Sequence, residues 1–238
     1  MKFTHILSLS FLRDGQEVTV HPVVVGGELL VDCGFPGQLP ALEAALGEAG
    51  LSPAGLRTIM ATHHDWDHVG CLASLKCAWP QLQVAASADD AARLEGREKS
   101  RRLVQAENLQ ADLPPEQQEA GRRFMAALSA VEPVRVDRIL KDGEIVGPGG
   151  ARVVATPGHM PGHLAVFVEE DGLLIAGDSL IADQGRLLMA NPRYTLDMAG
   201  ARESVRRLLD LPIQRVLCFH GGLVEGDVRK AMLEMLEA

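Results

Sequence analysis

Thr62-His63-His64-Asp65-Trp66-Asp67-His68 is the stretch that decides how this sequence is interpreted. Positions 63–68 hold three histidines and two aspartates. Histidine nitrogen and carboxylate oxygen are the donors that hydrolytic metal sites combine. The apolar run at 57–62 predicts a buried strand before the motif, and Val69-Gly70 follows it. A tight loop could direct residues 63, 65, 67 and 68 to one point, so the spacing predicts a metal site. A polar surface loop with histidines as caps is the alternative.

Three later segments place a possible ligand in a similar context, where a predicted strand ends in glycine-rich backbone. They are Thr156-Pro157-Gly158-His159 after a strand over 152–155, Gly177-Asp178-Ser179 after one over 173–176, and His220-Gly221-Gly222 after one over 215–219. Residues at strand ends are exposed and yet rigidly supported. Four such positions in one chain predict that their side chains share one site.

The rest of the pattern predicts layered α/β structure. Strands are expected over 6–12, 17–25 and 29–31, with turns at Asp14-Gly15 and Gly26-Gly27, and helices over 39–49 and 197–209 and at the C-terminus. The segment from 87 to about 130 is rich in Ala, Glu, Arg and Gln, and it predicts two helices split by Pro114-Pro115. We interpret it as a helical insertion, either a lid near the site or a packing layer.

Composition favours a single domain over 1–238, with 47% hydrophobic and 23% charged residues. The net charge of -9 argues against nucleic acid as a partner, and no apolar run is long enough to span a membrane. The four cysteines, Cys33, Cys71, Cys77 and Cys218, form no CxxC pair. We expect them to be small buried residues in a reducing cytoplasm. A small-molecule substrate is expected, and the oligomeric state stays open, with a homodimer as one option.

Together, these motifs make the sequence resemble the metallo-β-lactamase fold superfamily. The first motif is similar to the T-H-H-H-x-D-H of glyoxalase II, with Asp65 in place of its third histidine. Asp32-Cys33-Gly34 resembles the early D-T-G turn of the superfamily, and the motifs at 156–159, 177–179 and 219–221 follow in its order. The resemblance covers nearly the whole chain. It implies an αββα sandwich with two divalent metal ions at the sheet edges.

The resemblance also implies seven metal ligands, in two sets joined by a bridging carboxylate: His63, Asp65 and His159; Asp67, His68 and His220; and Asp178. The family usually has histidine at position 65, so the motif here is the variant HxDxDH. Aspartate adds negative charge and an oxygen donor. We expect it to favour iron or manganese relative to zinc, and to raise the pKa of a bound water.

The resemblance points to hydrolysis of a thioester, a lactone or another ester by a hydroxide that bridges the two metals. Asp67 would orient this nucleophile and collect its proton. Tyr194 could donate to a developing oxyanion and Arg193 could hold an anion, although a solvated loop is the alternative. For His64 and His163 we expect structural or ligand-orienting roles.

Two other functions stay open. Flavodiiron proteins share this fold and have a glutamate at the position of Asp65, so a di-iron oxidoreductase is one alternative. Those proteins depend on a flavodoxin domain, for which this chain has no room. The other alternative is a non-catalytic module that keeps its metals and binds a small molecule. Oxygen uptake would identify the first, and tight binding without turnover would identify the second.

Overall fold

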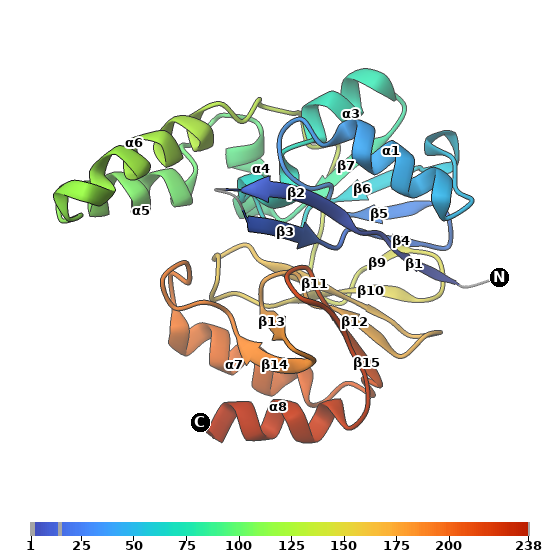
Figure 1. Cartoon of the computed structure of the whole chain (residues 1–238). Helices are drawn as coiled ribbons and strands as arrows, with labels where there is room; N and C mark the ends of the chain where they lie inside the picture. The colour runs from blue at the N-terminus through green and yellow to red at the C-terminus, as the bar shows by residue number, and fades with distance from the viewer. Residues whose placement is uncertain (1–2, 14–15, 238) are drawn as a thin grey trace.

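Strands that are apolar on both faces build the centre of the molecule. In the computed structural model, which describes residues 3–13 and 16–237, Val23 and Val25 face one core and Val24 faces another. Successive side chains of a strand point to opposite faces, so one apolar run serves two layers. Two six-stranded sheets result, which face each other and carry helices on their outer faces (Figure 1). The predicted αββα architecture is confirmed.

The N-terminal half forms the first sheet, in the order β1-β4-β5-β6-β7-β8. Strands β5 to β8 are parallel, whereas β1 and β4 pair antiparallel. Helices α1 (Leu39–Glu48) and α3 (Leu72–Ala78) cover its outer face with buried leucines. The strands are β1 (Thr4–Ile6), β4 (Val23–Val25), β5 (Leu29–Val31), β6 (Thr58–Met60), β7 (Gln83–Ala86) and β8 (Arg138–Ile139).

The C-terminal half forms the second sheet, in the order β16-β15-β12-β11-β10-β9. Helices α7 (Met198–Leu208) and α8 (Val228–Glu237) cover its outer face. Asp197 caps α7 as predicted, because its side chain accepts from the N–H of Gly200. The strands are β9 (Ile145–Gly147), β10 (Ala151–Ala155), β11 (Leu164–Val168), β12 (Leu173–Ile175), β15 (Arg215–Cys218) and β16 (Gly222–Val224).

Two hairpins and two short helical turns complete the elements outside the insertion. The predicted strands at 6–12 and 17–25 are each broken in two, the second at His21-Pro22, because proline has no N–H to donate to a ladder. The predicted turn at Asp14-Gly15 lies outside the described residues. The elements are β2 (Leu9–Arg13) with β3 (Gln16–Val20), β13 (Leu180–Asp183) with β14 (Arg186–Met189), η1 (Pro53–Gly55) and α2 (Trp66–Val69).

The segment 87–130 is helical as predicted, but it holds three helices rather than two: α4 (Ala88–Leu94), α5 (Arg101–Gln110) and α6 (Pro115–Ser129). Gly96, with φ 69°, follows the end of α4, and the side chain of Ser100 caps α5. These two signals mark the break that the prediction missed. Helices α5 and α6 lie side by side and project to one side of the sandwich (Figure 1).

All four cysteines are free thiols. Cys33, Cys71 and Cys218 are buried as expected, whereas Cys77 is exposed, contrary to the expectation. Across residues 3–13 and 16–237, every helix is too short or too polar to cross a bilayer.

Gly221 allows the chain to turn directly after His220. Its φ is 90°, and an added Cβ would lie 1.8 Å from the carbonyl oxygen of Ala182. We expect Gly221→Ala to lower the free energy of unfolding by about 3 kcal/mol or more, because left-handed strain adds to a backbone overlap.

Gly143→Ala is the matched control, because Gly143 has φ 78° but open space around it. It should cost only about 1 kcal/mol. Chemical denaturation measures both variants, and equal losses would contradict the overlap.

Candidate metal centre

Strands that run in the same direction deliver the motif residues to one edge of the sandwich. Strand β6 leads into His63, β12 leads into Asp178 and β15 leads into His220. Strands β5 to β7 are parallel in the first sheet, and β12 and β15 are parallel in the second. Parallel strands end at the same edge of their sheet. The edges of the two sheets meet here, because the candidate ligand atoms of His63, His68 and Asp178 lie within 4.8 Å of one another.

Three buried residues, His63, Asp65 and His159, form what we call the first metal position. Their candidate ligand atoms all lie within 4.8 Å of one another. Asp65 Oδ2 is 3.5 Å from His63 Nε2 and 3.3 Å from His159 Nε2. One imidazole comes from the first motif and the other from the loop after β10, so both halves of the chain contribute.

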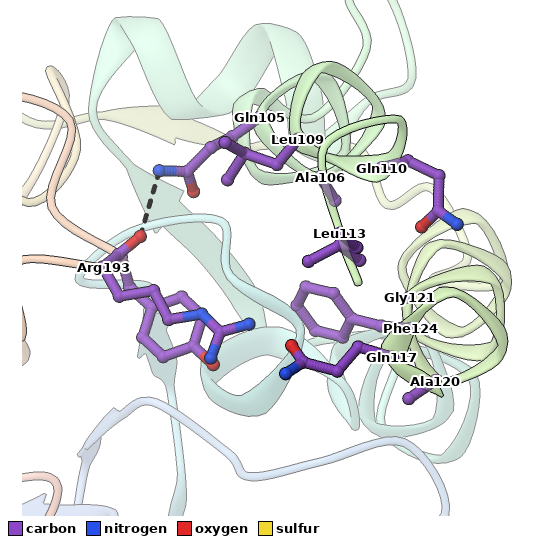
Figure 2. A pocket seen from close by; sticks show the side chains of 11 residues that line it. Gln105, Ala106, Leu109, Gln110, Leu113, Gln117, Ala120, Gly121, Phe124 and Arg193 are labelled. Atoms are coloured by element: carbon purple, nitrogen blue, oxygen red, sulfur yellow. Dashed lines mark hydrogen bonds between the residues drawn. The ribbon is translucent and has the colours of Figure 1, made fainter. Parts of the chain in front are cut away.

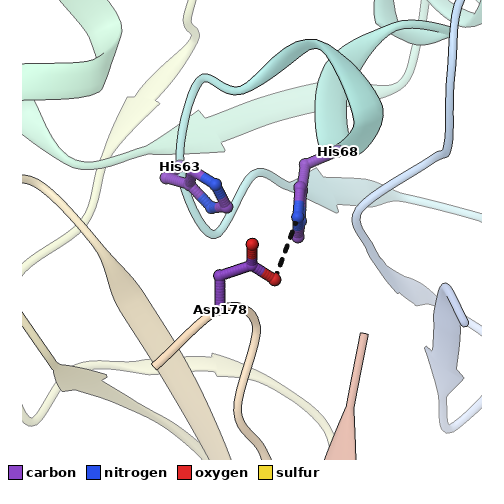
Figure 3. Close-up of side chains that lie close together, drawn as sticks. All are labelled: His63, His68 and Asp178. Atoms are coloured by element: carbon purple, nitrogen blue, oxygen red, sulfur yellow. Dashed lines mark ion pairs between the residues drawn. The ribbon is translucent and has the colours of Figure 1, made fainter. Parts of the chain in front are cut away.

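Asp67, His68 and His220 form the second metal position, where the candidate ligand atoms again lie within 4.8 Å of one another. Asp67 Oδ2 is 3.1 Å from His220 Nε2. Asp178 lies between the two positions: its Oδ1 is 3.3 Å from His68 Nε2 and its Oδ2 is 3.5 Å from His159 Nε2. Figure 3 shows its carboxylate facing the rings of His63 and His68.

Several buried donor atoms of this cluster have no hydrogen-bond partner within the described ranges: His63 Nε2, Asp65 Oδ1, His68 Nε2 and Asp178 Oδ1. Buried polar atoms are nearly always satisfied, so such a group indicates a missing ligand. The second metal position and Asp178 supply the mixed nitrogen and oxygen donors that a divalent transition metal takes. These residues therefore fit a metal ion.

Asp32 holds His68 in place. Its Oδ2 lies 2.8 Å from His68 Nδ1 and accepts from the Thr62 hydroxyl, while its Oδ1 accepts from the Thr62 N–H. A carboxylate on Nδ1 fixes the ring and leaves Nε2 directed at the cluster, which is how metal-binding histidines are usually oriented. The sequence showed Asp32 only as part of a turn motif.

His163 supports Asp178 from behind. Its Nε2 accepts a hydrogen bond from the Asp178 N–H at 3.0 Å, and its Nδ1 lies 2.7 Å from the Thr156 hydroxyl. Burial, with a smaller contribution from His159, lowers the pKa of His163 to about 3, so the ring is neutral and its Nδ1 donates to Thr156. The ring therefore orients the loop that carries a predicted ligand.

His64 turns away from the ligand cluster. Its Nδ1 bonds to Asp90 Oδ1 in α4, and its Nε2 accepts from the N–H of Arg101 in α5. Ser87 also donates to Asp90, whose carboxylate is fully buried. His64 therefore joins the first motif to the helical insertion, and its role is structural.

At Asp178 and His68, the charges of neighbouring groups shift the pKa in the direction opposite to the effect of burial. Burial raises the pKa of Asp178, but the neighbouring His220 and His68 hold it well below its usual range. Burial lowers the pKa of His68, but the surrounding carboxylates, led by Asp178, raise it well above its usual value. For His63, burial dominates and the pKa lies well below its usual value. Ionised carboxylates are thus held together at a site suited to a cation.

Arg102 is the site residue that the sequence reasoning missed. It lies on α5, is 3% exposed, and donates to Asp65 Oδ2 from Nε at 3.0 Å and from Nη2 at 2.6 Å. Burial raises the pKa of Asp65, but the charge of Arg102 holds it well below its usual range. A buried carboxylate in place of a neutral histidine requires a cation. The need of Asp65 for a cation, together with the arginines of the insertion, was the sequence signal that could have indicated Arg102.

A cavity of about 310 Å³ opens onto the cluster, and we call it the metal cavity. Tyr194 is part of its wall, with its ring centroid 5.3 Å from the guanidinium carbon of Arg102. The donation from Tyr194 to an oxyanion stays a prediction. Trp66 contacts Phe35 and Phe124 and also lines the cavity. Other wall residues are Val18, Ile181 and Asn191.

A second cavity of about 210 Å³ lies between α5, α6 and the loop at Arg193, and we call it the apolar cavity (Figure 2). It shares Phe124 and Tyr194 with the metal cavity. Gln105 donates to the carbonyl oxygen of Arg193 and so ties the loop to α5. Helices α5 and α6 therefore form a wall of the site. Apolar lining residues are Ala106, Leu109, Leu113 and Ala120.

Comparison with known proteins agrees with this architecture. The family model described as Metallo-beta-lactamase superfamily matches residues 19–220. A hydroxyacylglutathione hydrolase from Thermosynechococcus vestitus is 30% identical over 217 residues, which cover 90% of this chain and 67% of that protein. The probable metallo-hydrolase YflN from Bacillus subtilis is 26% identical over 211 residues, covering 81% and 75%. A solved structure of a metallo-beta-lactamase family protein from Thermus thermophilus has a TM-score of 0.74 and 27% identity, covering 99% and 78%.

We expect Asp32→Asn to weaken metal binding at the second metal position by about 10- to 100-fold, because an amide N–H would replace the oxygen that faces His68 Nδ1. Asparagine tolerates the φ of 58° at this position, so the backbone should be kept. Titration of metal-free protein against a chromophoric chelator measures the affinity. Asp183→Asn, an exposed change on β13, is the control. Unchanged affinity in Asp32→Asn would contradict the orienting role.

Proposed function

Because this chain belongs to the metallo-beta-lactamase superfamily, we propose that it is a metal-dependent hydrolase that cleaves a thioester, a lactone or another ester. The proposal rests on one observation: the buried donor atoms His68 Nε2 and Asp178 Oδ1 make no hydrogen bond, and they lie beside Asp67 and His220 where a cavity opens. Relatives named hydroxyacylglutathione hydrolase support an acyl thioester as the first substrate class to test.

Asp67, His68 and His220 would hold the metal ion, with Asp178 beside them. A divalent ion bound there would lower the pKa of a water molecule and polarise the electrophile. Asp32 and His163 act behind these residues, since the first fixes the ring of His68 and the second fixes the backbone of Asp178. The ligand atoms are thereby held before substrate arrives, so little reorganisation is needed during the reaction.

Asp67 is the residue we assign to proton transfer. Its side chain is 15% exposed and lines the metal cavity, and its Oδ2 lies 3.1 Å from His220 Nε2. A carboxylate in this place can orient an attacking water, accept its proton and return that proton to the leaving group. Once that proton is returned, the leaving group would depart as a neutral thiol or alcohol rather than as a thiolate or alkoxide.

Tyr194 is the residue we assign to the developing oxyanion. It lies in the wall of the metal cavity, and the guanidinium of Arg102 lies over its ring. A phenol donor aimed at the attacked carbonyl would stabilise the negative charge that forms on the oxygen. Arg193 lines the adjoining apolar cavity, where it could hold an anionic group of a substrate.

The apolar cavity supports a substrate with an apolar arm. Leu109, Leu113 and Phe124 line it, and Phe124 and Tyr194 connect it to the metal cavity. An acyl or alkyl group placed there would leave water, and its ester carbonyl would lie toward the cluster. We therefore include in the proposal that α5 and α6 select the substrate.

We expect Asp178→Ala to lower ester or thioester turnover by about a thousandfold or more and to reduce the metal content, because it removes the carboxylate between the two positions. The measurement is a panel of ester, thioester, lactone and phosphoester substrates, run after reconstitution with zinc, manganese or iron, together with elemental analysis.

Asp183→Ala, which removes an exposed carboxylate on β13, is the control for charge and should match the unmodified protein. Full activity in Asp178→Ala would refute its assignment. No turnover by the unmodified protein on any member of the panel, with any of the three reconstituted metals, would refute the hydrolase.

We expect Ala106→Phe to fill the apolar cavity and to raise KM by about tenfold for octanoyl esters, with little effect on acetyl esters. Ala126→Phe makes the same change at an exposed site on α6 and should leave both values unchanged. Steady-state kinetics with the two ester lengths test this. Equal changes for acetyl and octanoyl esters would contradict the selection by α5 and α6.

A further inference from the structure

The first metal position already holds a cation, the guanidinium group of Arg102. Both Nε and Nη2 donate to Asp65 Oδ2, and Nη2 also lies 3.1 Å from His159 Nε2. A guanidinium group has no lone pair to offer, so His159 Nε2 is the acceptor in the last contact. Arg102 therefore uses Asp65 Oδ2 and His159 Nε2, the two atoms that face each other at 3.3 Å, and leaves His63 Nε2 and Asp65 Oδ1 without a hydrogen bond in the described residues.

A metal ion could not share these atoms with Arg102. Asp65 Oδ2 is the oxygen that faces both histidine nitrogens, at 3.5 and 3.3 Å, and it is also the oxygen to which Arg102 donates twice. The lone pair of His159 Nε2 would likewise be required by both cations. Two positive groups this close repel each other strongly in a site sheltered from water. The residues of the first metal position therefore do not fit a metal ion while Arg102 is bound.

We propose that Arg102 is an internal competitor for the first metal position. The chain binds one divalent ion tightly at the second metal position, and it admits a second ion only when the side chain of Arg102 leaves Asp65. Metal loading is thereby unequal, and the helical insertion controls it.

The backbone around Arg102 is anchored, so the exchange is confined to its side chain. Ser100 caps α5, the N–H of Arg101 donates to His64 Nε2 at 3.2 Å, and the guanidinium of Arg101 pairs with Asp89 at 2.7 Å. After leaving Asp65, the guanidinium of Arg102 still has partners within reach. It already bonds to Gln105 Oε1 and lies over the ring of Tyr194, and both residues line the apolar cavity.

The test is a titration of the full, chelator-stripped protein with Co²⁺, followed by visible absorption and calorimetry. For the unmodified protein we expect one tight equivalent and a second that binds about 100-fold more weakly, because its entry must break a buried ion pair. In Arg102→Met, the second equivalent should bind about tenfold more tightly or better than in the unmodified protein.

Arg101→Met is the matched control. It removes the same charge from the neighbouring position of α5, but its partner is Asp89, outside the ligand cluster. It should keep the unequal pattern of the unmodified protein. A gain in second-site affinity equal to that of Arg102→Met would show a general charge effect and would overturn the proposal.

Three further outcomes of the titration bear on the role of Arg102. Two equally tight equivalents in the unmodified protein would overturn the proposal whatever the variants do. So would a second equivalent that is unchanged or weaker in Arg102→Met, since Arg102 would then be a supporting partner of Asp65. If Arg102→Met fails to fold, Arg102→Lys replaces it and should narrow the gap between the two affinities, because an ammonium group cannot reproduce both contacts.

The inference rests on the proposed metal centre, and the titration separates the two. Failure of the metal centre itself would appear as no tight equivalent in any of these proteins. Failure of the Arg102 inference would leave the tight equivalent intact and change only the second one.

Discussion

The centre of this molecule depends on buried polar atoms that the protein does not satisfy by itself. His63 Nε2, His68 Nε2 and Asp178 Oδ1 are buried and lack hydrogen-bond partners within the described part of the chain, although the last two face each other as an ion pair at 3.3 Å. Each such atom costs roughly 1–3 kcal/mol when it loses water without gaining a partner. The two hydrophobic sheets keep the strand ends in place against that cost. A bound cation would offset it, so metal binding and folding stability are linked at this edge of the sandwich.

Aspartate in place of histidine at position 65 raises the cost of burying polar groups in the cluster. A neutral imidazole can be buried without a counter-charge, but the Asp65 carboxylate is 5% exposed and needs one. Arg102 supplies it, so the extra negative charge that we expected to favour iron or manganese is compensated by an arginine. We therefore expect any metal preference to depend on the pair Asp65 and Arg102 together.

The sequence predicted which candidate ligands would lie close together better than it predicted what surrounds them. His159, Asp178 and His220 could be placed because each follows an apolar run into glycine-rich backbone. Strands that run in the same direction then bring these residues to the same edge. Arg102 could not be placed, since it reaches the cluster from a helix whose position depends on tertiary contacts such as that between His64 and Asp90. The third helix of the insertion was missed because Gly96 and Ser100 are weak signals inside a strongly helical composition.

Helix α5 connects parts of the site that the sequence motifs leave separate. Arg101 joins it to the loop of the first motif, Arg102 occupies the first metal position, and Ala106 and Leu109 line the apolar cavity. A substrate arm that enters this cavity would press on the helix that presents Arg102, and Tyr194 contacts both spaces. Because the backbone of α5 is anchored at its N-terminus, the side chain of Arg102 is the element free to respond. On the proposed assignments, metal occupancy and substrate occupancy would therefore be coupled through one side chain rather than through movement of the sheets.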